Sequence, residues 1–235
     1  RRDYREMLFS AKEAMSSYIS GVILYDETIR QKARDGRMLT DLIKAAGSIP
    51  GIKVDAGAQD MAGFPGEKIT EGLDGLRARL KDYYALGARF AKWRAVIDIA
   101  ETIPTPGAIT ANAHALARYA ALCQENGIVP IVEPEVLMDG HVAAHSIDRC
   151  YEVTEFTLKT VFAALYEQRV KLEGMVLKPN MVIAGKNAKV QASAAEVAEK
   201  TVRCFKTTVP VAVPGIAFLS GGQSDVQATE NLSLM

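Results

Sequence analysis

The chain has 235 residues, 49% of them hydrophobic, which is enough to bury a core as one large or two small domains. Its 28 basic residues balance its 28 acidic ones, so a net charge of zero provides no basic field for nucleic acid or an anionic membrane. No apolar stretch approaches the roughly 18 residues of a membrane span. The odd number of cysteines, all in helix-like stretches, predicts reduced thiols that fill the core, at Cys123, Cys150 and Cys204.

Helical and strand patterns alternate along the chain. Apolar residues at helical spacing predict a helix over residues 3–18, and an apolar run then predicts a strand over 21–25. The same two patterns continue with a helix at 38–46, a strand at 51–55, a Gly-rich loop at 57–70, a helix at 73–84, a strand at 90–96, a helix at 110–126, a strand at 128–133, a helix at 146–169, a strand at 173–178, a helix from Ser193, a strand at 213–219 and a helix from Ser224.

Near-continuous apolar strands that alternate with helices are typical of a parallel sheet. The strands recur at intervals of roughly 30 to 45 residues, slightly longer than in a plain (β/α)8 barrel. This spacing alone does not separate a barrel from an open doubly wound sheet. No G-x-G-x-x-G or G-x-x-x-x-G-K-[ST] motif follows any strand, which disfavours the nucleotide-binding versions of these folds.

The run Glu173–Met181 places a lysine at the end of a buried strand. Alternation puts Gly174, Val176 and Lys178 on one side of this strand, and Pro179 ends it. A lysine in that position is costly unless it is paired or has lost its proton. The alternative is a side chain that extends past the strand end into solvent.

Three other predicted strands end in charged residues two positions apart, so that both members of each pair face the same way. The pairs are Lys53 with Asp55, Lys92 with Arg94, and Glu133 with Glu135. Any one of these pairs, taken alone, is explained as charged residues at a strand end that is exposed to solvent. Three such pairs, with Lys178 and Ser220, indicate instead a site at the carboxyl edge of the sheet, where barrels and doubly wound sheets build their active sites.

These residue types suit imine chemistry on a phosphorylated carbonyl compound. A lysine becomes nucleophilic when it is desolvated or near a second cation, and Lys92 could be that cation for Lys178. Imine formation also needs an acid and a base, for which Glu133 and Glu135 are candidates. Positive charge for an anionic substrate comes from Lys53 and Arg94. The turn Ser220-Gly221-Gly222, before a helix start, offers backbone N–H groups to a phosphate.

Five motifs at these strand ends resemble, in order, those of class I fructose-bisphosphate aldolases. They are Gly51-Ile-Lys-Val-Asp55, Phe90-Ala-Lys-Trp-Arg94, Pro130-Ile-Val-Glu-Pro-Glu135, Leu177-Lys-Pro-Asn-Met181 and Phe218-Leu-Ser-Gly-Gly-Gln-Ser224. The segments Glu71–Leu76 and Asn112–Ala120 are similar to the same family, nearer its bacterial and plant members. The resemblance covers residues 1–235.

The resemblance implies a (β/α)8 barrel, usually a homotetramer, that reversibly cleaves fructose 1,6-bisphosphate to dihydroxyacetone phosphate and glyceraldehyde 3-phosphate in glycolysis and gluconeogenesis. It implies neither a metal nor a cofactor, and no nucleic-acid or membrane partner. By resemblance, Lys178 is the Schiff-base lysine, Glu133 is the principal acid–base group, and Lys92 assists electrostatically with Glu135 beside it. The resemblance also implies that Lys53 and Arg94 bind the distal 6-phosphate, and that Ser220, Gly221 and Gly222 bind the 1-phosphate.

Two histidines could imitate a zinc motif, because His141 and His145 are four residues apart. No third ligand is evident, so we do not predict a metal site there. The same stretch, 139–146, departs from the Asp-Gly-Asp-His pattern that is usual in the family, and this affects only a surface loop.

Compared with the family, the chain begins after a strand with an aspartate that assists C–C cleavage. It ends before a glycine and an arginine for the 1-phosphate and before a C-terminal tyrosine used in proton transfer. We therefore expect residues 1–235 to be a partial barrel domain with strands two to seven of eight. The alternative is a non-catalytic remnant that retains phosphate-binding or assembly surfaces. We expect a cytoplasmic location, or a plastid if a transit peptide precedes the chain.

Overall fold

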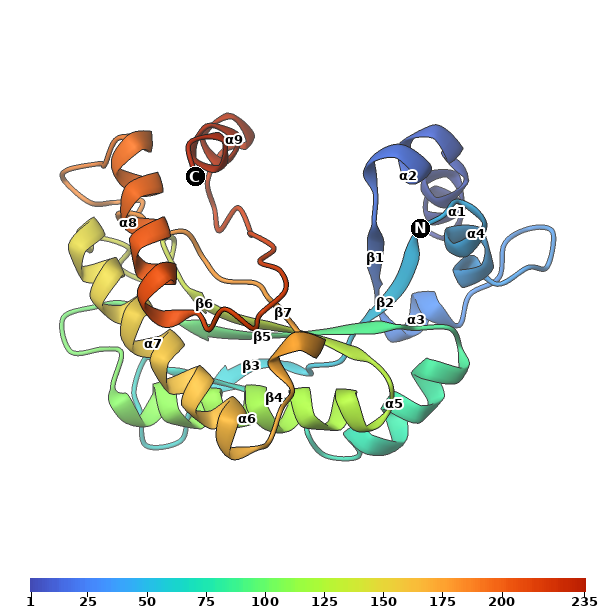
Figure 1. Cartoon of the computed structure of the whole chain (residues 1–235), viewed down its shortest axis with the longest axis horizontal. Coiled ribbons are helices and arrows are strands. Elements are labelled where there is room, and N and C mark those ends of the chain that lie inside the picture. Colours follow the sequence, from blue (N-terminus) through green and yellow to red (C-terminus); the bar gives the residue numbers. More distant parts are fainter.

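A computed structural model describes all 235 residues (Figure 1). Its helices are α1 (Arg2–Ser10), α2 (Lys12–Tyr18), α3 (Asp26–Ile29), α4 (Leu39–Ala45), α5 (Leu76–Ala85), α6 (Pro106–Glu125), α7 (Ile147–Glu167), α8 (Ala194–Thr208) and α9 (Asp225–Ser233), with a 3-10 turn η1 (Leu172–Gly174). Its strands are β1 (Gly21–Leu24), β2 (Ile49–Lys53), β3 (Gly57–Asp60), β4 (Lys68–Glu71), β5 (Phe90–Ile97), β6 (Val129–Val136) and β7 (Val176–Leu177).

The main sheet is parallel and follows the order β1-β2-β5-β6-β7. The strand predicted over 213–219 does not form as such: only an isolated parallel bridge between Leu177 and Ile216 extends the sheet there, beyond β7. Successive strands separated by helices, each next to the one before, are the arrangement of a (β/α)8 barrel. The fold prediction is confirmed for a partial barrel, since the sheet does not close between β1 and the segment around Ile216. Figure 1 shows β1 and α9 on opposite sides of this opening.

Strand β5 shows why the sheet has two distinct faces. Its alternate residues Ala91, Trp93, Ala95 and Ile97 are buried against the helices. Lys92 and Arg94 therefore project from the other face, as expected for a side-chain period of two. The next strand follows the same rule and puts its two glutamates on the face of these cations.

Helix α6 packs across the outer face of β5 and β6 (Figure 1). Thr105 caps its N-terminus by accepting a hydrogen bond from the backbone N–H of Ala108. Tyr119 on the same helix lies 5.6 Å from Trp93, ring centre to ring centre, and both side chains are fully buried. Such aromatic burial contributes strongly to core stability and fixes β5 relative to α6.

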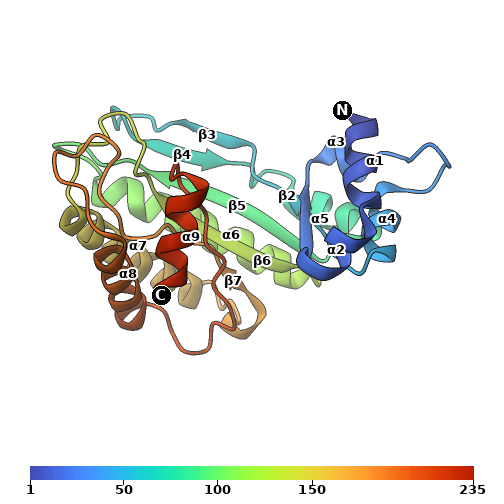
Figure 2. The same cartoon turned by 90° about the horizontal axis from the view of Figure 1, so that it is seen from above.

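The predicted loop at 57–70 is wrong, because β3 and β4 form an antiparallel hairpin there. Its residues are mostly polar and partly exposed, so they give no apolar alternation in the sequence. Figure 2 shows the hairpin running alongside β5. Asn112 of α6 anchors it: its side chain accepts from the backbone N–H of Thr70 and donates to the backbone oxygen of Lys68.

Other elements also differ from the predictions. The helix expected over 3–18 is split at Ala11 into α1 and α2, and the short helix α3 was not predicted. The strand expected over 173–178 begins with the 3-10 turn η1, so only Val176 and Leu177 form ladder pairs. The buried residues Met175 and Leu177 still alternate as predicted, which keeps Lys178 on the face of the sheet opposite the helices.

The three cysteines are free and buried, as predicted. None of the helices has the length and apolar character that a membrane span requires.

Candidate active site

A carboxylate lies between two lysines on the face of the sheet opposite the helices. Lys178 directly follows β7 as predicted, whereas Lys92 and Glu133 lie within β5 and β6, because both strands continue further than the sequence indicated. Glu133 Oε1 is 2.5 Å from Lys178 Nζ, and Glu133 Oε2 is 3.3 Å from Lys92 Nζ. The Glu133 side chain is only 3% exposed, while those of Lys178 and Lys92 are 21% and 13% exposed. A buried carboxylate needs such cationic partners. The three residues therefore form one charged unit with its lysines partly open to solvent.

The main-chain ladder places Lys178 opposite Glu133. The backbone N–H of Lys178 donates to the Val132 oxygen at 2.8 Å, which continues the β6–β7 ladder by one residue beyond β7. Asn180 closes the same edge, since its buried side-chain oxygen accepts from the backbone N–H of Val136 at 3.0 Å. Its amide nitrogen donates to Thr154 of α7 at 3.1 Å. The segment after Lys178 is thus fixed to both the sheet and a helix.

A second ion pair lies next along the same strands, between Arg94 Nε and Glu135 Oε2. Glu135 is buried, whereas the Arg94 side chain is 43% exposed. Burial alone would lower the pKa of Arg94, but the hydrogen bond and charge of Glu135 raise it on balance. Arg94 therefore stays positively charged and has N–H groups left for an anionic ligand.

The third predicted pair is also formed, at the end of β2. Lys53 Nζ lies 2.6 Å from Asp55 Oδ1 and 5.9 Å from the centre of the Tyr25 ring. Lys53 is directly opposite Lys92 in the β2–β5 ladder. The positive charge of the site therefore extends from Lys178 across the sheet to Lys53.

The turn Ser220-Gly221-Gly222 approaches the site from the last segment of the sheet. Both glycines have positive φ, +58° and +89°, which L side chains rarely adopt. A Cβ on Gly221 would lie 3.7 Å from Glu135 Oε1, so this turn is close to the carboxylate pair. Ser220 is exposed, and α9 starts just beyond, where Ser224 caps it by accepting from the backbone N–H of Gln227.

A cavity of 670 Å³ opens beside Arg94. Its lining includes Lys68, Asp98, Asp139 and His141. It provides space next to the exposed guanidinium for a polar ligand group.

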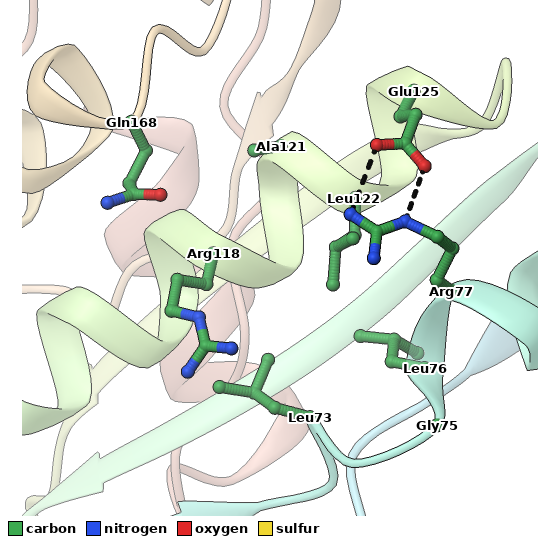
Figure 3. Close-up of a pocket in the computed structure, with 9 residues that line it drawn as sticks. All are labelled: Leu73, Gly75, Leu76, Arg77, Arg118, Ala121, Leu122, Glu125 and Gln168. Atoms are coloured by element: carbon green, nitrogen blue, oxygen red, sulfur yellow. Dashed lines mark hydrogen bonds and ion pairs between the residues drawn. The ribbon is translucent and has the colours of Figure 1, made fainter.

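Another cavity, of 340 Å³, lies between α5, α6 and the end of α7 (Figure 3). Its one carboxylate, Glu125, is paired with Arg77, and Arg118 extends from α6 toward Leu73. It has no nucleophile and no free acid–base group. The cluster of Lys178, Glu133 and Lys92 is therefore the better candidate for chemistry.

The structure brings together most of the predicted site residues. Lys178, Glu133 and Lys92 are in direct contact, and Arg94 contacts Glu135. Lys53 and the glycine turn border this cluster without an ion pair to it. The chemical roles of these residues stay predictions.

Two acidic residues next to the site had no predicted role. Asp55 was expected only to share a face with Lys53, yet its side chain is 3% exposed. Asp139 lies against the glycine turn, since a Cβ on Gly222 would be 2.8 Å from its Oδ2. The two-residue spacing was the signal for Asp55, whereas Asp139 follows β6 in a loop with no pattern. His141 and His145 belong to no group of three potential metal ligands.

Comparisons with known proteins identify relatives over the whole chain. The family model described as "Fructose-bisphosphate aldolase class-I" matches residues 1–235. The "Probable fructose-bisphosphate aldolase class 1" of Xanthomonas axonopodis pv. citri is 63% identical over 235 residues, covering all of this chain and 69% of that protein. The "Fructose-bisphosphate aldolase, cytoplasmic isozyme" of Spinacia oleracea is 53% identical, covering 100% of this chain and 64% of that protein. A crystal structure of fructose-bisphosphate aldolase from Plasmodium falciparum, in complex with TRAP and a small-molecule inhibitor, superposes with a TM-score of 0.95 at 47% identity, covering 99% of this chain and 67% of that chain.

Proposed function

The chain belongs to the class I fructose-bisphosphate aldolase family, and from this premise we propose that it is a lyase that cleaves fructose 1,6-bisphosphate reversibly through a Schiff base on Lys178. The products are dihydroxyacetone phosphate and glyceraldehyde 3-phosphate. The observation that carries the proposal is the contact of Lys178 with Glu133 at 2.5 Å, at the carboxyl edge of a parallel sheet.

The geometry supports different roles for the two residues of this contact, with Lys178 as the nucleophile and Glu133 as the acid–base group. A proton on Lys178 can pass to Glu133 directly, which leaves a neutral amine to attack the C2 carbonyl carbon of the substrate. Attack gives a carbinolamine, and Glu133 then returns the proton to its hydroxyl so that water leaves and the iminium forms. The positive iminium accepts the electron pair of the breaking C3–C4 bond, while a general base takes the proton of the C4 hydroxyl and C4 becomes the aldehyde carbon of glyceraldehyde 3-phosphate.

Lys92 supports the same steps from the other carboxylate oxygen. Its ammonium, 3.3 Å from Glu133 Oε2, stabilises the ionised carboxylate whenever Glu133 has given up its proton. Glu135, next on the same face of β6, is held by Arg94. We assign Lys92 an electrostatic role and Glu135 a role in orienting the guanidinium.

The charge distribution supports two phosphate positions. In the order of the sheet, Lys53 of β2 and Arg94 of β5 lie on one side of Lys178, Arg94 lines the 670 Å³ cavity, and we assign these two residues the distal 6-phosphate. The Ser220-Gly221-Gly222 turn lies on the other side, and we assign its backbone N–H groups the 1-phosphate.

We further propose that residues 1–235 form one partial barrel domain, and that the protein is a cytoplasmic homotetramer, as the resemblance implies. The relatives from Spinacia oleracea and Arabidopsis thaliana that carry the words cytoplasmic and cytosolic in their names support the location. The non-catalytic alternative is not favoured, because the match to class I aldolases extends over all 235 residues.

The test is an assay of fructose 1,6-bisphosphate cleavage by the intact protein, with and without a strong metal chelator. We expect cleavage at the same rate in both, because the proposed electron sink is the iminium on Lys178. Loss of cleavage in the Lys178→Arg variant would support the assignment. Activity retained in that variant, or abolished by the chelator, would contradict it.

A further inference from the structure

A single buried carboxylate connects three segments around the proposed distal phosphate position. Asp55 Oδ1 lies 2.6 Å from Lys53 Nζ and accepts from the backbone N–H of Gly57 at 3.2 Å. Its other oxygen, Oδ2, accepts from the backbone N–H of Arg94 at 3.3 Å. Both oxygens of the side chain are thus in use, although only 3% of it is exposed.

The hydrogen bond from the Arg94 N–H to Asp55 replaces one main-chain hydrogen bond of the β2–β5 ladder. The β2–β5 ladder continues until Val54 donates to the Lys92 oxygen at 3.1 Å. In a parallel ladder the next donor on β5, the Arg94 N–H, would bond to the backbone of the neighbouring strand. Here the Val54 oxygen accepts from the Arg79 guanidinium at 3.0 Å instead, and the Asp55 side chain accepts from Arg94.

The chain leaves the sheet at this point to enter the hairpin. Gly57, the first residue of β3, has φ of +101° and donates to Asp55. The hairpin returns to the same place, because Thr70 of β4 donates its hydroxyl hydrogen to the Arg94 oxygen at 2.8 Å. The backbone of Arg94 is therefore held on its N–H by Asp55 and on its oxygen by Thr70.

The charge of Asp55 also limits where the Lys53 ammonium can lie. Besides pairing with the carboxylate, Lys53 donates to the backbone oxygen of Asp55 at 2.9 Å. A flexible four-carbon side chain that is 24% exposed would otherwise sample many rotamers. With both contacts in place, the ammonium has a fixed position and still has one N–H free for a ligand.

From these contacts we propose that Asp55 is a positioning residue for recognition of the distal phosphate: it holds the Lys53 ammonium and the Arg94 backbone in register with each other. The inference rests on the proposed function, in which Lys53 and Arg94 bind that phosphate. Asp55 itself does not touch the reacting atoms and acts through these two residues.

The experiment compares two substrates, fructose 1,6-bisphosphate and fructose 1-phosphate, which lacks the distal phosphate. The measured quantity is the ratio of their kcat/KM values in the intact protein. Asp55→Asn keeps the size of the side chain and one acceptor oxygen but removes the charge that fixes Lys53. We expect the ratio to fall about tenfold, chiefly through KM of the bisphosphate, with fructose 1-phosphate unaffected.

Three further variants complete the test. Lys53→Ala should lower the ratio by a similar factor, and adding Asp55→Asn to it should cause little further loss, because the two residues act together. Asp55→Ala should lower the ratio further, since the Arg94 N–H then also loses its acceptor. Asp82→Asn on α5, which breaks an exposed ion pair with Arg30, is the matched control and should leave the ratio unchanged.

The outcomes separate this inference from the proposed function. If Lys53→Ala lowers the ratio but Asp55→Asn does not, the positioning role of Asp55 is wrong while the phosphate assignment stands. Equal losses on both substrates in Asp55→Asn would mean a purely structural role and would also overturn the inference. If Lys53→Ala leaves the ratio unchanged, the distal-phosphate assignment itself fails, and the inference fails with it.

Discussion

Lys178 and Glu133 face each other across the β6–β7 ladder with 2.5 Å between the ammonium nitrogen and a carboxylate oxygen. A neighbouring main-chain hydrogen bond, from the Lys178 N–H to the Val132 oxygen, fixes the strand register that brings the two side chains together. The contact therefore depends on the register of two strands more than on the flexible lysine side chain.

Replacing Glu133 by glutamine should separate chemistry from binding. The amide cannot exchange a proton with Lys178, so kcat should fall by about a hundred- to ten-thousand-fold, while KM changes little. Steady-state kinetics on fructose 1,6-bisphosphate measure both constants. The control is Glu167→Gln, at the exposed end of α7, which should behave like the unmodified protein. An unchanged kcat in Glu133→Gln would move the acid–base role to another group.

Replacing Arg94 by alanine should weaken binding of the bisphosphate. A hydrogen bond to a charged group contributes roughly 1.5–3 kcal/mol, so KM should rise about ten- to a hundredfold. Arg94→Lys should recover part of this loss, since it restores charge without the planar fork. The variant also leaves Glu135 buried without its partner, so the melting temperature should be measured alongside. A KM that stays the same in Arg94→Ala would remove the guanidinium from the binding site.

Gly222→Ala tests the glycine turn. The residue has φ of +89°, and the new Cβ would lie 2.8 Å from Asp139 Oδ2. The left-handed conformation costs an L residue about 1–2 kcal/mol, so the turn should shift and the KM of substrates with a 1-phosphate should rise. Gly215→Ala is the control, because its Cβ would meet open space and its φ is not positive. Equal KM values for the two variants would argue against phosphate binding by this turn.

The burial of His145 predicts that the free energy of unfolding falls in mild acid. It is buried and neither ring nitrogen has a hydrogen-bond partner, and burial lowers the pKa of His145 below its ordinary 6.5. The backbone of Ile183 and the charge of Asp98 raise this pKa and the charge of Arg149 lowers it, but burial has the largest effect. As pH falls below about 6.5, the unfolded chain takes up a proton before the folded one does, so the free energy of unfolding should fall until pH passes the folded pKa.

Denaturant unfolding between pH 7.5 and 5 measures this effect. In His145→Leu, which cannot titrate and leaves no unpaired ring nitrogen, the acid-dependent loss should be smaller. His114→Leu, an exposed residue of α6, serves as the control. The same pH dependence in all three proteins would mean that other groups cause the loss.

The sequence predicted the parts of the fold that have a strong periodic pattern. Strand β5 alternates buried apolar residues with charged ones, and the two-residue spacing of Lys92 and Arg94, and of Glu133 and Glu135 on β6, placed these side chains on one face. The hairpin β3–β4 was missed because polar, exposed strands lack this alternation. The strand before Lys178 was too long in the prediction, because Glu173 and Gly174 belong to the 3-10 turn η1 and only Val176 and Leu177 form the strand.

The site could be predicted only as a set of residue types at one edge. Alternation placed the charged pairs together, but which carboxylate meets which cation depends on strand register, and register follows from tertiary packing. The contacts of Asp55 with the Arg94 backbone are a further example, because they link residues 39 positions apart where the ladder ends. No local pattern specifies such a contact.

The most direct test of the account is the identity of the residue that forms the Schiff base. The intact protein is incubated with dihydroxyacetone phosphate, reduced with borohydride and mapped by peptide mass spectrometry. We predict that the reduced three-carbon adduct lies on Lys178, because this lysine is next to Glu133, and that Lys178→Arg gives no adduct. An adduct on Lys92 or Lys53, or one that persists in Lys178→Arg, would contradict the central claim.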